Sequence, residues 1–187
     1  MQIAVAARTQ FAEAGYERAT FRSIATAAGV DPALVVHFYG SKADLFRQVM
    51  GLPPAVADAL VAIADLPRDQ LGRHLAQLVV GALESPETRP IVLGRIRCAS
   101  SHPDAAALVR ETVTRDLARL TSAITTDQPD TRAVMIGALV VGIALARYVV
   151  LVEPLASLPP EQVVEYLAPS FQRYLVEPLS SSDSGSS

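Results

Sequence analysis

The stretch FAEAGYERATFRSIATAAGVDPALVVHFYGSKADLF, residues 11–46, carries the clearest structural signals in this chain of 187 residues. Thr20 is a good helix N-cap, and apolar residues recur after it at the spacing of one helical face: Phe21, Ile24, Ala25 and Ala28. Gly29 ends this helix, because glycine readily adopts the left-handed backbone found at helix C-termini. The pattern predicts a short amphipathic helix followed by a sharp turn.

Further short helices are predicted on either side of this one. One covers residues 2–14 and stops at Gly15, and another begins after Asp31, which caps it with a proline in the first helical position. A fourth begins at Ser41, where Asp44 completes a variant of the capping box. Three short helices, with a glycine turn between the second and the third, have the arrangement of a helix-turn-helix.

The third helix of this unit has an unusual outward face. The residues expected to pack against the first two helices, on Phe11, Ile24 and Ala25, are Val30, Val35, Phe38 and Tyr39. The residues expected to point outward are Pro32, Ala33, Leu34, Val36 and His37. So apolar a face fits a DNA major groove, where aliphatic side chains touch thymine methyl groups and His37 can hydrogen-bond a base edge or a phosphate. The alternative, a three-helix unit that only packs, leaves that face unexplained.

Composition indicates a folded protein and argues against several classes of site. Hydrophobic residues make up 50% and charged residues 19%, which favours a sizeable core over disorder. A single cysteine and three scattered histidines predict no disulfide, no zinc site and no other metal centre. No nucleophile–base pair, paired carboxylates or phosphate loop is visible, so we expect no enzyme and no cofactor. Residues 1–50 hold five basic and four acidic residues against a net charge of −3 overall, a small bias toward an N-terminal DNA-binding segment.

Helix signals continue to the end of the chain, and no strand pattern appears, so the fold class is predicted to be all-α. A breaker, Gly-Leu-Pro-Pro at residues 51–54, suggests a division into a helix-turn-helix domain at 1–50 and a second helical domain at 51–179. The helices expected in the second domain cover residues 54–64, 67–83, 86–100, 103–126, 131–152 and 160–176. The Ser-rich segment 180–187 is predicted to be a disordered tail.

The segment at residues 133–152 is apolar and long enough to cross a bilayer. Arg147 lies within it, and a guanidinium at the bilayer centre costs about 2.5–3.5 kcal/mol. Acidic residues precede and follow the segment, and one side lacks a basic flank. We therefore expect a helix buried on nearly all sides in a protein core and no membrane association. The single cysteine fits a reducing compartment, and the protein is expected to be cytoplasmic.

The motif-bearing residues resemble the tetracycline-repressor (TetR) family of bacterial regulators. The matching pieces, in order, are F-x-E-x-G-Y, T-x-x-x-I-A-x-A-A-G-V and H-F-Y-x-S-K-x-x-L-F within residues 11–46. Residues 147–175 look like the last helices of an actinobacterial-type subgroup. Carried over by position, the family's DNA contacts fall on Thr20, Arg22, Ala33, Leu34, Val36, His37 and Lys42. Two departures are Val36, where many members have tyrosine, and the lack of a basic stretch before the first helix.

The resemblance implies a homodimer whose C-terminal domain dimerises and holds a small-molecule effector. The interface residues expected on the last two helices are Val141, Leu145, Tyr148, Val164, Leu167 and Phe171. Two-fold symmetry would then set the recognition helices about 34–36 Å apart and predicts a palindromic operator in double-stranded DNA.

The effector pocket is expected where polar residues interrupt apolar helical positions. The candidates are His74, Arg95, Arg97, Cys98, Thr121 and Tyr148. Apolar residues dominate the expected walls, which favours an apolar effector. The resulting hypothesis is a ligand-responsive transcriptional regulator, by family default a repressor. The alternative is a helical protein-interaction module that does not bind DNA.

Overall fold

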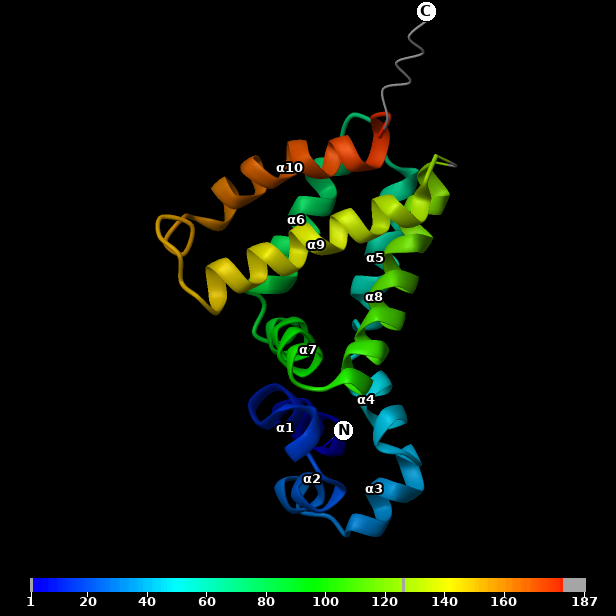
Figure 1. Ribbon diagram of the computed structural model, residues 1–187, viewed down its shortest axis with the longest axis vertical. Coiled ribbons are helices and arrows are strands. Elements are labelled where there is room, and N and C mark those ends of the chain that lie inside the picture. The colour runs from blue at the N-terminus through cyan, green and yellow to red at the C-terminus, as the bar shows by residue number, and fades with distance from the viewer. Residues whose placement is uncertain (1, 126, 180–187) are drawn as a thin grey trace, which may run out of the picture. The chain divides into compact units, whose positions relative to one another are not determined.

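The computed structural model describes residues 2–125 and 127–179, and every regular element in these ranges is a helix. The elements in chain order are α1 (Gln2–Arg18), α2 (Phe21–Ala28), α3 (Pro32–Tyr39), α4 (Lys42–Val49), α5 (Pro54–Ala62), the 3₁₀ turn η1 (Ile63–Asp65), α6 (Leu71–Glu84), α7 (Arg89–Ser101), α8 (Pro103–Ile124), α9 (Pro129–Tyr148) and α10 (Pro160–Val176) (Figure 1). The all-α fold class is therefore confirmed. The Ser-rich tail predicted at 180–187 lies outside the described residues.

The helices form two compact units that do not follow chain order. Unit 1 takes in the described residues up to Pro54 together with Ala82–Val113, and unit 2 takes in Ala55–Gly81 and the chain from Thr114 onward. The packing unit around the helix-turn-helix is therefore larger than the predicted segment 1–50. It includes the whole of α7 and the first half of α8.

Close packing of α7 on α1 is the reason for this difference. Gly94 of α7 lies so near α1 that a Cβ atom there would be 3.2 Å from the Cα of Ala12. On the same helix, Cys98 is fully buried and its thiol donates to the carbonyl of Phe11, with 3.3 Å between the heavy atoms. Nothing in the spacing of residues 86–100 shows which helix they pack against, so chain order was a poor guide.

The core of unit 1 is built around three aromatic rings. Phe46 of α4 meets Phe11 and Tyr16 of α1 edge to face, with ring centroids 5.0 and 5.3 Å apart. Gly15 has φ +80°, so the helical backbone of α1 breaks there, as predicted, before a last turn that ends at Arg18. The break places Tyr16 in the core although it follows the main body of the helix.

In unit 2, α6 crosses α10 at a backbone-to-backbone contact. A Cβ atom on Gly72 would be only 2.4 Å from the backbone nitrogen of Gln172. The Gln172 side chain accepts a hydrogen bond from the Gly72 N–H at 2.7 Å and donates to the carbonyl of Arg68 at 2.6 Å. It thereby satisfies backbone groups at the start of α6, which helices otherwise leave unpaired.

α9 lies beside α10 in unit 2 and is anchored there by a buried arginine (Figure 1). Arg132, which is 2% exposed, donates to the carbonyls of Tyr174 at 2.7 Å and Glu177 at 2.8 Å and pairs with Asp127. These carbonyls belong to the C-terminal end of α10, where helices have unpaired acceptors. The first turn of α9 is thus fixed to the last turn of α10.

Two expectations about the apolar segment are corrected. The helix ends at Tyr148, not at residue 152, because Leu151 takes a left-handed backbone with φ +58°. It is also not buried on nearly all sides, since 28% of its most apolar window is buried. By length and composition α9 could span a membrane, which is weak evidence, since core helices of soluble proteins pass the same test. Arg147, near its end, donates to the carbonyl of Leu155 within unit 2.

Candidate DNA interface

The turn between α2 and α3 is fixed by local hydrogen bonds at both ends of α2. The Thr20 hydroxyl accepts from the backbone N–H of Ser23 at 3.1 Å, and the Ser23 hydroxyl accepts from the Thr20 N–H at 3.0 Å. At the other end, Gly29 has φ +66°, and Val30 donates back to the carbonyl of Ala25 at 3.0 Å. These are a reciprocal capping box and a left-handed C-cap, so α3 leaves α2 at a defined angle.

α3 has a single buried side chain, Val35, among its described residues. Asp31 caps the helix by accepting from the Ala33 N–H at 2.7 Å. Successive residues turn by roughly 100°, so Ala33 and His37 lie opposite Val35, at the centre of the outward face. Leu34 stands on one flank of that face and Val36 on the other. In Figure 1, α3 lies at the edge of unit 1, on the side away from α7.

The prediction that Phe38 packs inward is wrong. Its side chain is 64% exposed and lies one helical turn after Leu34, which is 42% exposed. Val35 and Tyr39, also one turn apart, already cover the α2 side of α3, so Phe38 points past α2. Phe38 is therefore an outward-facing residue of α3 that the sequence pattern did not predict. The Leu34–Phe38 spacing of four could have indicated it, because both would then share one flank.

The polar residues expected to hold phosphates are placed in different ways. Thr20 and Arg22 are exposed at the N-terminal end of α2. Lys42 is half-buried, and its ammonium donates to the carbonyl of Glu17 at 3.0 Å and lies 4.7 Å from the centroid of the Tyr16 ring. Burial lowers the pKa of Lys42 from its ordinary value. Lys42 therefore ties the start of α4 to the end of α1, whatever contact it makes with DNA.

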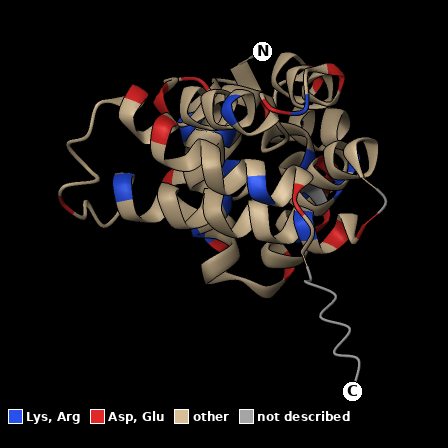
Figure 2. Ribbon diagram, turned by 90° about the horizontal axis from the view of Figure 1, so that it is seen from above, with Lys and Arg blue, Asp and Glu red and all other residues tan. Residues whose placement is uncertain are grey.

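Most cations in this part of the molecule already have a partner within the protein. Arg8 and Arg18 donate to carbonyls of Val49 and Ala14, and Arg47 pairs with Asp44 at 2.9 Å. Among residues 2–50, all described, Arg22 alone of the arginines and lysine makes no side-chain hydrogen bond or ion pair within the protein. Figure 2 shows basic and acidic positions interspersed along the helices. The candidate interface therefore combines one guanidinium without an internal partner, that of Arg22, with an apolar outward face of α3.

Two family models cover most of the chain. Residues 3–49 match the bacterial regulatory proteins of the tetR family, and residues 69–175 match the tetracyclin repressor-like C-terminal domain. The chain belongs to the TetR family. Members of this family are ligand-responsive, DNA-binding transcription regulators, so the predicted family and function are confirmed at that level. TetR-family regulators are soluble proteins.

Solved structures of TetR-family regulators resemble the chain over nearly its whole length. One, from Streptomyces coelicolor, has 34% identity and a TM-score of 0.69 and covers 93% of this chain and 92% of its own. NalD, the secondary repressor of the MexAB-OprM multidrug efflux pump in Pseudomonas aeruginosa, has 23% identity, a TM-score of 0.66 and 94% coverage of both chains. FadR, a fatty acid degradation regulator from Bacillus halodurans, has 18% identity and a TM-score of 0.64 and covers 89% and 96%. The last two show the fold alone. Comparison with curated proteins gave no significant match.

In this TetR-family chain, half of the expected effector residues have structural roles in unit 1. Arg95 and Arg97 of α7 donate to the carbonyls of Met50 and Ala12, and Cys98 donates to Phe11. These bonds fasten α7 to the helix-turn-helix, and the expected role of the three residues in an effector pocket stays a prediction. The remaining candidates, which lie in unit 2 and stay predictions, are His74, Thr121 and Tyr148.

The expected dimer residues divide between the surface and the core of unit 2. Val164, Leu167 and Phe171 of α10 are 8%, 6% and 0% exposed, so they belong to the protomer's own core, and their part in a dimer interface stays a prediction. Their apolar stripe faces α9 and α6, as the stripe of a surface helix does. Val141 on α9 is 39% exposed, and Leu145 and Tyr148 are partly buried. These three remain interface predictions.

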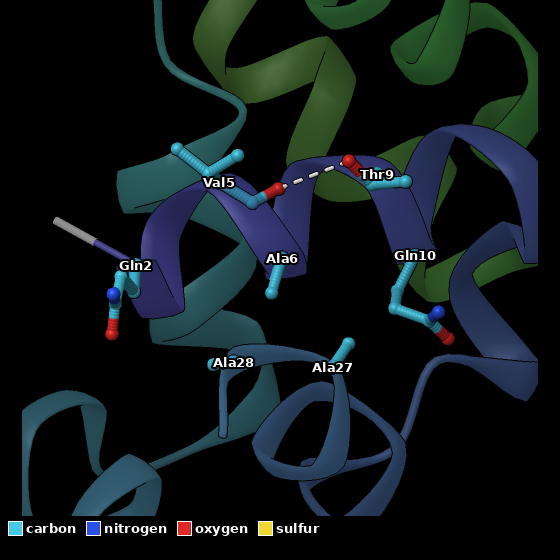
Figure 3. Close-up of a pocket in the computed structure, with 7 residues that line it drawn as sticks. All are labelled: Gln2, Val5, Ala6, Thr9, Gln10, Ala27 and Ala28. Carbon is cyan, nitrogen blue, oxygen red and sulfur yellow. Dashed lines mark hydrogen bonds between the residues drawn. The ribbon is translucent and has the colours of Figure 1, made fainter. Parts of the chain in front are cut away.

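An open groove of about 460 Å³ lies within the helix-turn-helix unit. In Figure 3, Gln2, Ala6 and Gln10 of α1 point toward Ala27 and Ala28 of α2. The predicted effector residues do not line this groove. Its lining consists of alanines, Val5, Thr9 and two neutral amides, so no charged side chain lines this groove.

Proposed function

We propose that this TetR-family regulator binds a palindromic operator as a homodimer and represses transcription until a small apolar effector releases it. The observation that carries the proposal is the exposed outward face of α3, centred on Ala33 and His37 and presented by a rigidly capped turn. A helix of this kind fits the major groove of B-DNA. Arg22, exposed near the N-terminus of α2, is placed on the same unit to hold the phosphate backbone.

An exposed apolar face on α9 supports the homodimer. Val134, Met135 and Val141 are 59%, 38% and 39% exposed, and the small residues Ala138 and Gly142 lie between them on the same side. A Cβ atom on Gly142 would meet nothing within 4 Å in the protomer. Small residues let a second helix approach closely, and an apolar face of this length is costly to leave in water. A two-fold partner would cover it with the same face of its own α9.

The effector is expected in the C-terminal part of the chain, near His74, Thr121 and Tyr148. Thr121 is fully buried, and its hydroxyl donates to the carbonyl of Pro129 at 2.9 Å, so it is a wall residue more than a ligand donor. Aliphatic side chains dominate the surrounding helices, which favours an apolar ligand. The effector must bind the DNA-free state more tightly than the operator-bound state, because only differential affinity shifts the equilibrium. The protein is expected to act in the cytoplasm and to have no catalytic activity.

DNA binding is tested by fluorescence anisotropy with a labelled duplex that carries the intergenic palindrome beside the regulator's own gene. Arg22→Ala and His37→Ala are each expected to weaken binding about tenfold, because hydrogen bonds to charged groups contribute about 1.5–3 kcal/mol and base contacts about 1–3 kcal/mol. Both side chains are exposed, so the thermal midpoint should stay unchanged.

Arg119→Ala is the matched control, since Arg119 is an exposed arginine of α8 outside the helix-turn-helix. It removes the same charge and should leave affinity unchanged. Wild-type protein that binds this duplex no better than a scrambled one, in a folded and dimeric state, would favour the alternative of an interaction module without DNA binding. Lys42→Ala is a less direct probe, because it also removes the contacts with Glu17 and Tyr16.

A further inference from the structure

The outward face of α3 presents carbon almost exclusively. Leu34, Val36 and Phe38 are 42%, 47% and 64% exposed, and Ala33 lies between them at the centre of the face. Of the exposed side chains from Pro32 to Phe38, all within the described part of the chain, only His37 carries a nitrogen or oxygen atom. Its ring packs against that of Phe38, with centroids 5.4 Å apart. This is therefore a helix with one hydrogen-bonding group and four hydrocarbon groups on its reading side.

The chemistry of base edges determines what such a face can distinguish. Guanine is read through its O6 and N7 acceptors by arginine or lysine, and adenine is read by asparagine or glutamine. None of these residue types lies on the outward face of α3. The one apolar group that a base pair presents in the major groove is the C5-methyl group of thymine. A hydrocarbon face gains free energy from that methyl group and from no other feature of the groove.

We propose that α3 selects its operator by the C5-methyl groups of pyrimidines, with Leu34 and Phe38 on one flank of the helix and Val36 on the other as the side chains that contact them. The inference rests on the proposed function, because it assumes that α3 lies in the major groove. Thymine supplies the methyl group in ordinary DNA, and 5-methylcytosine carries it at the same position of the groove. The operator half-site is accordingly rich in thymine where α3 contacts it, and His37 supplies the single hydrogen bond.

The residues around the outward face of α3 favour DNA over a protein as its binding partner. Arg22 lies in the first turn of α2. Among the arginines and the lysine of residues 2–50, it is the one without a side-chain partner inside the protein. The caps of α2 and α3 hold the face rigidly, since Thr20, Ser23 and Asp31 all hydrogen-bond to backbone N–H groups. A rigid apolar helix beside a cation suits a groove lined by phosphates. If a protein were the partner, the same side chains would contact that protein and their substitution would not change DNA affinity. The test below distinguishes this outcome.

The test begins with selection of a preferred duplex from a random 24-base-pair library by the full-length protein. The selected sequence is then made in three forms: with thymine, with uracil in place of thymine in both half-sites, and with 7-deazaguanine in place of guanine. Uracil removes only the methyl group, and 7-deazaguanine removes only the N7 acceptor. Burial of one methyl group corresponds to about a fourfold change in affinity. We expect uracil to weaken binding about fourfold per contacted thymine. In His37→Ala protein, which lacks the one hydrogen-bonding side chain of the face, 7-deazaguanine should change binding less than twofold.

A second arm restores the methyl group by another base. A thymine–adenine pair at a uracil-sensitive position is replaced by cytosine–guanine and, separately, by 5-methylcytosine–guanine. The methylated pair should bind about fourfold more tightly than the unmethylated pair. Equal binding of the two pairs at every uracil-sensitive position would overturn the proposal.

Variants connect the methyl effect to the named side chains. Leu34→Ala and Phe38→Ala should each reduce the ratio of uracil to thymine dissociation constants toward one at specific positions. Val61→Ala, which shortens a valine of α5 that is 44% exposed, should keep the wild-type ratio. Circular dichroism and the thermal midpoint verify that each variant is folded.

The outcomes separate this inference from the proposed function. If no duplex is enriched from the library, the proposed function fails. If a duplex is enriched but the thymine and uracil forms bind equally, the methyl inference alone fails. If operator affinity is unaffected by Leu34→Ala and Phe38→Ala, the face has another occupant, such as a protein, and the inference fails by that route.

Discussion

Cys98 shows how a single side chain reports on the attachment of α7 to α1. It is fully buried, and its thiol donates to the carbonyl of Phe11. Burial raises the pKa of the Cys98 thiol to about 11. At pH 8 about one thiol in a thousand is then ionised, and only the thiolate is reactive.

We predict that Cys98 resists labelling until α7 separates from α1. In 5,5′-dithiobis(2-nitrobenzoate) at pH 8, native protein should react at least 100-fold more slowly than protein in 6 M guanidinium chloride. The matched variant Cys98→Ala/Ser100→Cys moves the thiol to an exposed position of α7 and should react rapidly in the native state. Rapid labelling of the wild type under native conditions would show that this contact is open in solution.

The sequence predicted the roles of some single residues well and of others poorly. Thr20, Gly29 and Asp31 could be assigned as caps because a cap is decided by neighbours within three residues. Phe38 could not be placed, since its direction depends on whether Val35 and Tyr39 suffice to cover α2. The roles of Arg95 and Arg97 depend on carbonyls 45 and 85 residues away in the chain, which no local pattern shows.

At the scale of helices, two glycines of α6 should behave in opposite ways. Gly72→Ala would place a Cβ atom 2.5 Å or less from backbone atoms of Ala168 and Gln172, and neither can move without displacing α10. We expect a loss of at least about 2 kcal/mol in the free energy of unfolding, because overpacking between two backbones cannot be relieved by a rotamer change.

Gly81→Ala is the control for helix propensity in the same element. A Cβ atom there meets nothing within 4 Å, so the substitution should stabilise the protein by about 0.5–1 kcal/mol. Urea unfolding monitored by far-ultraviolet circular dichroism measures both. Equal effects of the two substitutions would contradict the close crossing of α6 and α10.

The helices themselves were predictable, but their ends and partners were less so. Proline and cap residues marked most starts, because these residues act on the first helical turn directly. The end of α9 at Tyr148 was missed, since the run of valines and leucine after it is as apolar as the helix. That α10 turns its stripe toward its own protomer follows from tertiary packing, and the same stripe would suit a partner equally well.

At the scale of the whole molecule, the exposed face of α9 makes association testable. Val141→Glu introduces a charge at the middle of that face, and an unpaired buried carboxylate is costly. We predict that sedimentation velocity at micromolar concentration changes from dimer to monomer and that operator affinity falls at least tenfold, because a monomer contacts one half-site.

Val61→Glu adds the same charge on α5 at a valine of similar exposure and should remain dimeric. A wild-type protein that sediments as a monomer would refute the homodimer outright. The existence of a dimer could be inferred from the sequence by resemblance alone. The side of α9 that is proposed to face the partner could be chosen only from the structure, because burial inside the protomer decides which side stays exposed.

The small number of cations without internal partners around α3 bears on how DNA affinity would depend on ionic strength. Each phosphate that a cation neutralises releases condensed counterions, so a regulator that relies on many cations loses orders of magnitude in affinity as ionic strength rises. Here Arg8, Arg18, Lys42 and Arg47 are engaged within the protein, and the reading face is hydrocarbon. If the proposed operator complex forms, its affinity should fall less steeply with rising potassium concentration than that of a regulator that neutralises many phosphates, and such a protein would stay on its operator longer under osmotic stress.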